Sequence, residues 1–256
     1  MTLTIITLTF NNTDEFQKTA ESVQKSRELG AKFRWLIVDG HSTEPHQQAI
    51  KNKMIEGDQL IYDQGKGIYA AMNLALANLD PDGHALFINS GDALYPDSMS
   101  EIKDLSPEKS YCYTGFIVTN CDAFHRKWVT KSNGNMIPMH GAFIFSTNHA
   151  AGLVFDVKRN TNADTIFMDT VIDREQVEYR PEPITVFKTG GVSTGENVWA
   201  LRKLIQSQGI KRAPRFIMRL FILNILGHLG YRLIYHNRFE RLDTDRSDKV
   251  MKLVRN

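Results

Sequence analysis

Three strand-like runs in the N-terminal part of the chain constrain its fold more than any other feature. They span Thr4 to Phe10, Trp35 to Ser42 and Ala85 to Asp92, and each breaks into polar residues at its C-terminal end. Helix-like segments separate them, which is the pattern of right-handed crossovers between parallel strands. Because the carboxyl ends of parallel strands share one edge of a sheet, ligands collect at that edge. The sequence therefore predicts an α/β protein whose polar strand ends gather at one site.

The periodicity of the remaining sequence completes this prediction. Phe16, Ala20 and Val23 recur at helical spacing between Thr13 and Leu29. After the third run the pattern becomes mixed, which predicts a mixed sheet in the C-terminal half. The other expected elements are helices over 47–55, 67–79 and 162–173 and strands over 60–62, 110–119, 124–130, 141–145 and 184–187.

The composition fits one domain with an appended segment. The chain has 256 residues, of which 42% are hydrophobic and 23% charged, as in ordinary globular proteins. Its two cysteines, Cys112 and Cys121, have neither metal-ligand spacing nor the pattern of a disulfide framework. Together with an N-terminus that lacks the features of a secretory signal, they predict a cytoplasmic protein.

Charge is unevenly distributed along the chain. Residues 1–196 hold 18 Lys and Arg against 25 Asp and Glu, whereas residues 197–239 hold eight basic residues and no acidic one. We therefore expect a domain over 1–196 and a basic amphipathic helical tail over 197–256. Arg215 and Arg219 alternate with apolar residues, as in a helix that lies in the plane of a membrane. A helical hairpin packed on the domain, or a dimer interface, explains the pattern equally well.

The third strand-like run ends in a motif that could bind a ligand or a metal, Phe87-Ile88-Asn89-Ser90-Gly91-Asp92. A lone carboxylate after small turn residues, at the ligand edge of a sheet, can hold Mg²⁺ or Mn²⁺ against a phosphate. Many α/β proteins also carry a strand-end Asp that only caps the next segment. The motif by itself leaves both roles open.

Four motifs, taken together in their order along the chain, resemble those of a known family. They are Thr4 to Asn11, Val38 to Thr43, Asp63 to Asn73 and Phe87 to Asp92. The sequence resembles the inverting family 2 glycosyltransferases, in particular bacterial exopolysaccharide enzymes of the colanic-acid type, over residues 3–195. The resemblance implies a GT-A fold, with a Rossmann-like βαβ nucleotide-binding half. It also implies sugar transfer from a nucleotide diphosphate donor to a glycan or polyprenyl-linked glycan in surface polysaccharide synthesis.

The same motifs imply a donor site. Asp39 would contact the base or ribose, Lys66 would neutralise phosphate charge, and Asp92 would hold the metal. Gly65 would let the backbone approach the diphosphate closely. The usual acidic pair of the metal motif is reduced to Asp92 alone, so the metal must rely on phosphate oxygens and waters as well. The implied donor-binding residues are Thr9, Asn11, Asp39, Gly65, Lys66, Tyr69, Asn73, Ser90 and Gly91.

An inverting transfer also needs a base that takes the proton of the acceptor hydroxyl. The stretch Met139 to Phe143 resembles the family's acceptor-side motif, which places His140 on the acceptor side. Asn162-Ala163-Asp164 resembles the segment that carries the base. Asp164 is thus the implied catalytic residue, and Asp169 is the nearest alternative.

A last motif lies near the end of the predicted domain. Phe187 to Ser193 resembles the family's closing motif, in which Gly190 and Gly191 would form a mobile loop over the donor.

Two other functions are alternatives to glycosyl transfer. A sugar-phosphate nucleotidyltransferase would need a glycine-rich basic signature after the first strand, and Phe10 to Thr13 lacks one. A non-catalytic nucleotide-sugar-binding scaffold is compatible with the reduced metal motif.

Overall fold

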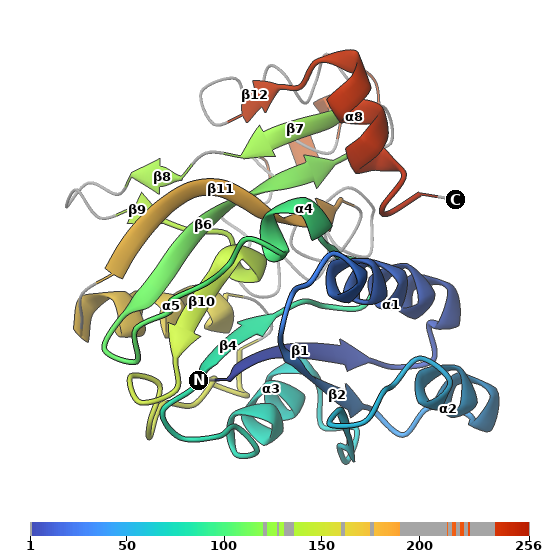
Figure 1. Ribbon diagram of the computed structural model, residues 1–256, viewed down its shortest axis with the longest axis vertical. Coiled ribbons are helices and arrows are strands. Elements are labelled where there is room, and N and C mark those ends of the chain that lie inside the picture. The colour runs from blue at the N-terminus through green and yellow to red at the C-terminus, as the bar shows by residue number, and fades with distance from the viewer. Residues whose placement is uncertain are drawn as a thin grey trace.

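The computed structural model describes residues 2–119, 122–126, 128–130, 136–159, 162–174, 177–189, 214, 217–218, 221–222, 225 and 239–255 (Figure 1). These residues form an α/β structure around a mixed sheet. The elements in chain order are β1 (Leu3–Thr9), α1 (Thr13–Glu28), β2 (Arg34–Asp39), α2 (Glu44–Lys51), β3 (Gln59–Tyr62), α3 (Ile68–Leu76), β4 (His84–Phe87), β5 (Ala93–Leu94), α4 (Pro96–Met99), β6 (Ser110–Val118), β7 (Ala123–Arg126), β8 (Val129–Thr130), β9 (Met136–Ile137), η1 (His140–Ala142), β10 (Phe143–Ser146), α5 (Ala163–Arg174), β11 (Val177–Lys188), β12 (Phe239–Arg241) and α8 (Thr244–Met251).

The main sheet has the strand order β12-β7-β6-β10-β4-β1-β2-β3. The last four strands of this order run parallel, with register pairs such as Thr9 with Asp39. β10 then pairs antiparallel with both β4 and β6, and β11 pairs parallel with β6 and antiparallel with β5. The predicted change from a parallel N-terminal half to a mixed C-terminal half is confirmed.

Helices cover both faces of the parallel half. Ile5 of β1 belongs to the apolar cluster of Phe16 on α1, whereas its neighbour Ile6 belongs to the cluster of Met72 on α3 and Phe167 on α5. Successive side chains of a strand point to opposite faces, so a continuous apolar run is what burial on both faces requires. This double burial fixes the strands rigidly and leaves their polar carboxyl ends for a ligand.

Element boundaries follow local signals. α2 begins at Glu44 rather than at the expected Gln47, because Pro45 occupies the first turn and Thr43 precedes it in an extended conformation. The short elements β5 and α4 come directly after Asp92 and were not expected from periodicity. They matter for the site, since the amide of Leu94 donates a 3.0 Å hydrogen bond to Ser22 Oγ on α1.

The C-terminal end of the chain returns to the sheet. β12 pairs antiparallel with β7, and α8 lies beside them at the top of Figure 1. Val250 and Val254 pack in one apolar cluster with Ala93 of β5 and Phe116 of β6. Residues 239–255 therefore complete the sheet structure, which differs from the expectation of a helical tail over 197–256. Most of 190–238 lies outside the described residues.

Candidate active site

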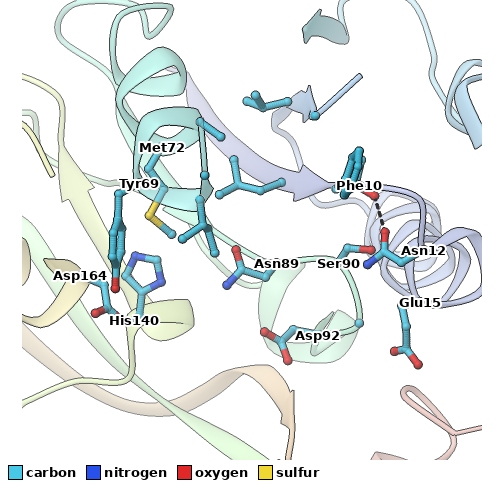
Figure 2. Close-up of a pocket in the computed structure, with 18 of the residues that line it drawn as sticks. Phe10, Asn12, Glu15, Tyr69, Met72, Asn89, Ser90, Asp92, His140 and Asp164 are labelled. Atoms are coloured by element: carbon cyan, nitrogen blue, oxygen red, sulfur yellow. Dashed lines mark hydrogen bonds between the residues drawn. The ribbon is translucent and has the colours of Figure 1, made fainter. Parts of the chain in front are cut away.

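A cavity of about 970 Å³ opens at the carboxyl ends of β1, β2 and β4 (Figure 2). This volume lies in the range of sites that enclose a medium-sized ligand. Strand ends, the start of α3, the turn after β4, the start of α5 and the end of β11 all contribute to it. The lining residues that carry the argument below are Thr9, Phe10, Asn12, Glu15, Gly40, Asp63, Gly65, Tyr69, Asn89, Ser90, Gly91, Asp92, His140, Asp164 and Lys188.

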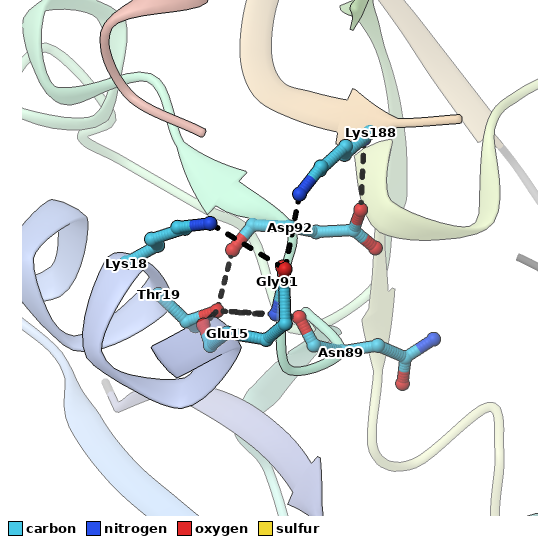
Figure 3. A network of polar contacts seen from close by, with 7 residues as sticks. All are labelled: Glu15, Lys18, Thr19, Asn89, Gly91, Asp92 and Lys188. Atoms are coloured by element: carbon cyan, nitrogen blue, oxygen red, sulfur yellow. Dashed lines mark hydrogen bonds and ion pairs between the residues drawn. The ribbon is translucent and has the colours of Figure 1, made fainter. Parts of the chain in front are cut away.

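Helix α1 holds the turn that carries Asp92 (Figure 3). Thr19 Oγ1 donates to the carbonyl oxygen of Asp92 at 2.6 Å and accepts from the amide of Gly91 at 3.0 Å. Gly91 has a φ of +99°, and a Cβ at this position would lie 2.7 Å from Oε2 of Glu15. This left-handed φ favours glycine, and the Glu15 carboxylate would have to move to make room for a Cβ. The turn therefore has a defined shape and presents the Asp92 carboxylate to the cavity.

Asp92 is held in an environment that disfavours its charge. Its pKa is raised from 3.8 to about 7, mainly by burial; the nearby Glu15 carboxylate adds to this rise, and the amide and ammonium groups of Lys188 oppose it. Among the described residues, no group of three His, Cys, Asp or Glu side chains is arranged to hold a metal. One or two carboxylates suffice for Mg²⁺ when phosphate oxygens and waters complete the ligand set. Asp92 can supply one such carboxylate.

Lys188 joins the end of β11 to this turn. Its backbone amide donates to Oδ1 of Asp92 at 3.1 Å, and its Nζ lies 3.0 Å from Oε1 of Glu15. Lys18 approaches the same Glu15 oxygen at 3.4 Å. Figure 3 shows the Glu15 carboxylate between the two ammonium groups. Charges of both signs thus meet at one end of the cavity.

Asp164, His140 and Tyr69 lie together on another side of the cavity (Figure 2). Asp164 belongs to the first turn of α5, and the amide of Ala163 donates to the Tyr69 hydroxyl at 3.3 Å. Burial lowers the pKa of His140 and raises the pKa of Tyr69 to about 12, while the charge of Asp164 raises both pKa values. Nε2 of His140 is buried without a hydrogen-bond partner among the described residues. Two neutral polar groups therefore flank one carboxylate.

The ends of β1, β2 and β3 form the remaining wall. Phe10 is 60% exposed, and its ring lies against Gly40, where a Cβ would come within 3.1 Å of it. Oδ1 of Asp63 accepts from the amide of Gly65 at 2.5 Å, which shapes the loop before α3. Gly65 has a φ of +67°, a conformation that suits glycine. An exposed aromatic ring and a tightly turned glycine loop thus line the same cavity.

The structure brings most of the predicted site residues to this cavity. Asp164 lines it and its alternative, Asp169, does not. Gly190 and Gly191 lie outside the described residues. The predicted residues that line the cavity are Thr9, Gly65, Tyr69, Ser90, Gly91, Asp92, His140 and Asp164.

Four predicted donor residues are not among the lining residues, and their roles stay predictions. Lys66 is exposed. Asp39 is completely buried and accepts a 2.5 Å hydrogen bond from Ser42 Oγ. Ser42 Oγ in turn accepts from the amide of Asn11 at 2.8 Å, so Asp39 fixes the loops after β1 and β2. The Asn73 amide exchanges two hydrogen bonds, of 2.9 and 2.7 Å, with the backbone of Phe155.

Three charged residues of the cavity, Glu15, Asp63 and Lys188, were given no site role from the sequence, although Asp63 opens one of the four motifs. Glu15 occupies the first turn of α1, where an acidic residue needs no explanation beyond the helix dipole. Lys188 precedes the predicted glycine loop but carries no motif signal of its own. Only their hydrogen-bonded partners, Gly91 for Glu15 and Asp92 for Lys188, place them in the site.

Comparison with solved structures shows which known fold the chain has. No protein-family model matches the chain, and no curated protein matches it in sequence. Residues 1–349 of S. aureus TarS in complex with UDP align with a TM-score of 0.58 at 15% identity, over 91% of this chain and 75% of that chain. The complex of the same TarS fragment with UDP-GlcNAc gives a TM-score of 0.58 at 13% identity, over 91% and 76%.

A third structure is that of a mannosyltransferase. The mannosyltransferase PcManGT from Pyrobaculum calidifontis, in complex with GDP-Man and Mn²⁺, aligns with a TM-score of 0.54 at 12% identity, over 86% of this chain and 69% of that chain. At these identities the likeness concerns the fold alone. The chain has the mixed α/β, GT-A-type fold that these glycosyltransferases share, as the sequence predicted.

Proposed function

We propose that the protein is an inverting glycosyltransferase that moves a sugar from a nucleotide diphosphate donor to a glycan or lipid-linked glycan acceptor. One observation carries the proposal: a single cavity joins the strand-end carboxylate of Asp92 to the carboxylate of Asp164 on α5. Such a transfer uses one carboxylate at the diphosphate and another at the acceptor hydroxyl. The shared fold with proteins that bind UDP, UDP-GlcNAc and GDP-Man supports this reading.

The donor would lie along the strand ends. The exposed face of Phe10 suits stacking with a nucleobase. Asp39 would act on this end indirectly, because its buried carboxylate orders Ser42 and, through it, Asn11. The diphosphate would then reach the turn of Gly91 and Asp92, whose backbone is fixed by α1.

A divalent cation, when bound, would neutralise charge on the diphosphate and stabilise it as a leaving group. Asp92 is the residue that would hold Mg²⁺ or Mn²⁺, with phosphate oxygens and waters as further ligands. The bound Mn²⁺ of PcManGT supports a cation in this fold. A bound cation would favour the ionised form of Asp92 and so lower its raised pKa, because a nearby positive charge stabilises the carboxylate.

Asp164 would serve as the base. It takes the proton of the acceptor hydroxyl while that oxygen forms a bond to the anomeric carbon, and the bond from this carbon to the phosphate oxygen breaks on the opposite face. The configuration at the anomeric carbon is thereby inverted. Neutral His140, with Nε2 unpaired among the described residues, would hydrogen-bond to the acceptor.

The acceptor and the location belong to the proposal as well. In the part of the chain that the structure describes, no helix is long and apolar enough to cross a membrane. Ile217, Met218, Phe221 and Ile225 nevertheless expose 53–62% of their surface. Together with the basic residues of 197–239, they support peripheral contact with the inner face of the plasma membrane, where a polyprenyl-linked glycan would be found.

The proposal is tested by a panel of nucleotide sugars. UDP-GlcNAc, GDP-Man and related donors are screened by thermal shift with and without Mn²⁺, because a ligand selective for the native state raises its melting temperature. Donors that bind are then assayed for release of nucleoside diphosphate. An enzyme releases it, whereas a scaffold binds the donor without turnover. Stabilisation by no nucleotide sugar, or release of pyrophosphate from a nucleoside triphosphate and a sugar phosphate, would contradict the proposal.

A further inference from the structure

The ion pair of Lys188 with Glu15 has no part in the transfer described so far. Glu15 comes from α1 and Lys188 from the end of β11, and both line the cavity beside Asp92. The ammonium lies 3.0 Å from Oε1 of Glu15, while the backbone amide of the same lysine donates to Asp92 (Figure 3). The backbone of Lys188 is thus fixed at the Asp92 carboxylate, which would face the diphosphate of the donor.

We propose that Lys188 binds the diphosphate of the donor, and that Glu15 holds the lysine ammonium until the donor arrives. This inference rests on the proposed function, because it assigns a partner to one end of the same donor site. It adds a charge-carrying group that does not depend on a metal.

The charges of the cavity support this assignment. Glu15 and Asp92 are both acidic, and a diphosphate that entered beside them would meet repulsion. Among the described residues that line the cavity, Lys188 is the only Lys or Arg. Its ammonium is a compact charge with three donors, which suits phosphate oxygens. A diphosphate offers more negative charge than one carboxylate, so it competes well for this group.

Moving the Lys188 ammonium from Glu15 to the diphosphate costs little free energy. The side chains of Lys188 and Glu15 are 34% and 36% exposed, and ion pairs at such exposure contribute little to stability. The flexible stem of lysine lets Nζ move while the backbone stays hydrogen-bonded to Asp92. Lys18 remains 3.4 Å from Oε1 of Glu15, so this carboxylate keeps a cation after Lys188 has turned to the donor.

The test compares a nucleoside diphosphate with its nucleoside. Binding of UDP and uridine, or of GDP and guanosine, is measured by calorimetry in EDTA for the parent, Lys188→Met, Glu15→Gln and the double variant. Lys188→Met should weaken binding of the diphosphate about tenfold, or about 1.4 kcal/mol, and leave the nucleoside unchanged. Glu15→Gln should tighten diphosphate binding, because it frees the ammonium. The double variant should behave like Lys188→Met, as expected for residues that act through one contact.

Lys109→Met is the matched control. Lys109 lies 3.4 Å from Glu178, and this pair is 40% and 39% exposed, but neither residue lines the cavity. Its loss should change neither affinity. Equal diphosphate affinity of Lys188→Met and the parent would overturn the assignment. Weaker diphosphate binding by Glu15→Gln than by the parent in EDTA would overturn the holding role of Glu15. A parent that binds neither nucleoside nor diphosphate would refute the donor site itself.

Discussion

Replacing Asp92 with Asn should stabilise the ligand-free protein while removing its metal carboxylate. Burial raises the pKa of Asp92 from 3.8 to about 7, so ionisation costs the folded state free energy that the unfolded state does not pay. The shift corresponds to about 4 kcal/mol at 1.36 kcal/mol per pKa unit, and partial exposure of the residue lowers the expected gain to on the order of 2–3 kcal/mol. Asn keeps the shape and can still accept from the Lys188 amide.

The sign of the pH dependence makes this prediction specific. A carboxyl with a raised folded-state pKa contributes most below its unfolded pKa of 3.8, and the contribution is lost as pH rises toward about 7. Urea denaturation of the parent and Asp92→Asn should therefore show a small difference at about pH 4 and the full gain at about pH 8. Asp248→Asn removes an exposed carboxylate of α8 and serves as the control. An Asp92→Asn protein that is no more stable than the parent at about pH 8 would refute the reasoning.

Three further predictions concern stability, each measured by urea denaturation. Gly91→Ala should cost about 1–3 kcal/mol, because a φ of +99° and the Glu15 carboxylate both oppose a Cβ; a neutral effect would mean that the turn rearranges freely. Val250→Ala should cost on the order of 1–2 kcal/mol by opening the buried cluster of α8, and no loss would show that α8 is not packed in solution. Burial lowers the pKa of His46, so the unfolded state protonates first and stability falls as pH drops below 6.5. His46→Asn should flatten this fall, and an unchanged slope would exclude His46 as its cause.

The strand runs predicted the parallel α/β half, and the motif resemblance added the GT-A fold. β1 and β4 are buried along their whole length, so their sequences consist of apolar residues and a few buried polar ones and end where the polar site begins. The same logic located Asp92 and, through the motif resemblance, Asp164, which the structure places on one cavity. Residues tied to strand ends and helix starts are predictable because local periodicity determines those positions.

Contacts between distant segments could not be predicted in this way. Nothing near Glu15 in the sequence indicates that it meets Lys188, since the two residues are brought together only by the packing of α1 and β11 around the Asp92 turn. Likewise, β12 has three residues, too few for a strand pattern, and becomes a strand because β7 offers it an edge. Asn73 shows the converse case, in which a motif residue hydrogen-bonds to the Phe155 backbone and lies away from the cavity lining.

The central claim is that one cavity holds the donor beside a carboxylate that deprotonates the acceptor. Its most direct test is the rate of nucleoside diphosphate release measured alongside donor affinity for Asp164→Asn and Asp169→Asn, with the donor identified by the thermal-shift panel. The account predicts that Asp164→Asn lowers turnover by roughly 10²–10⁴-fold at nearly unchanged donor affinity, whereas Asp169→Asn, which does not line the cavity, stays active. Parental turnover by Asp164→Asn would contradict the account, and loss of activity in Asp169→Asn alone would move the base to that residue.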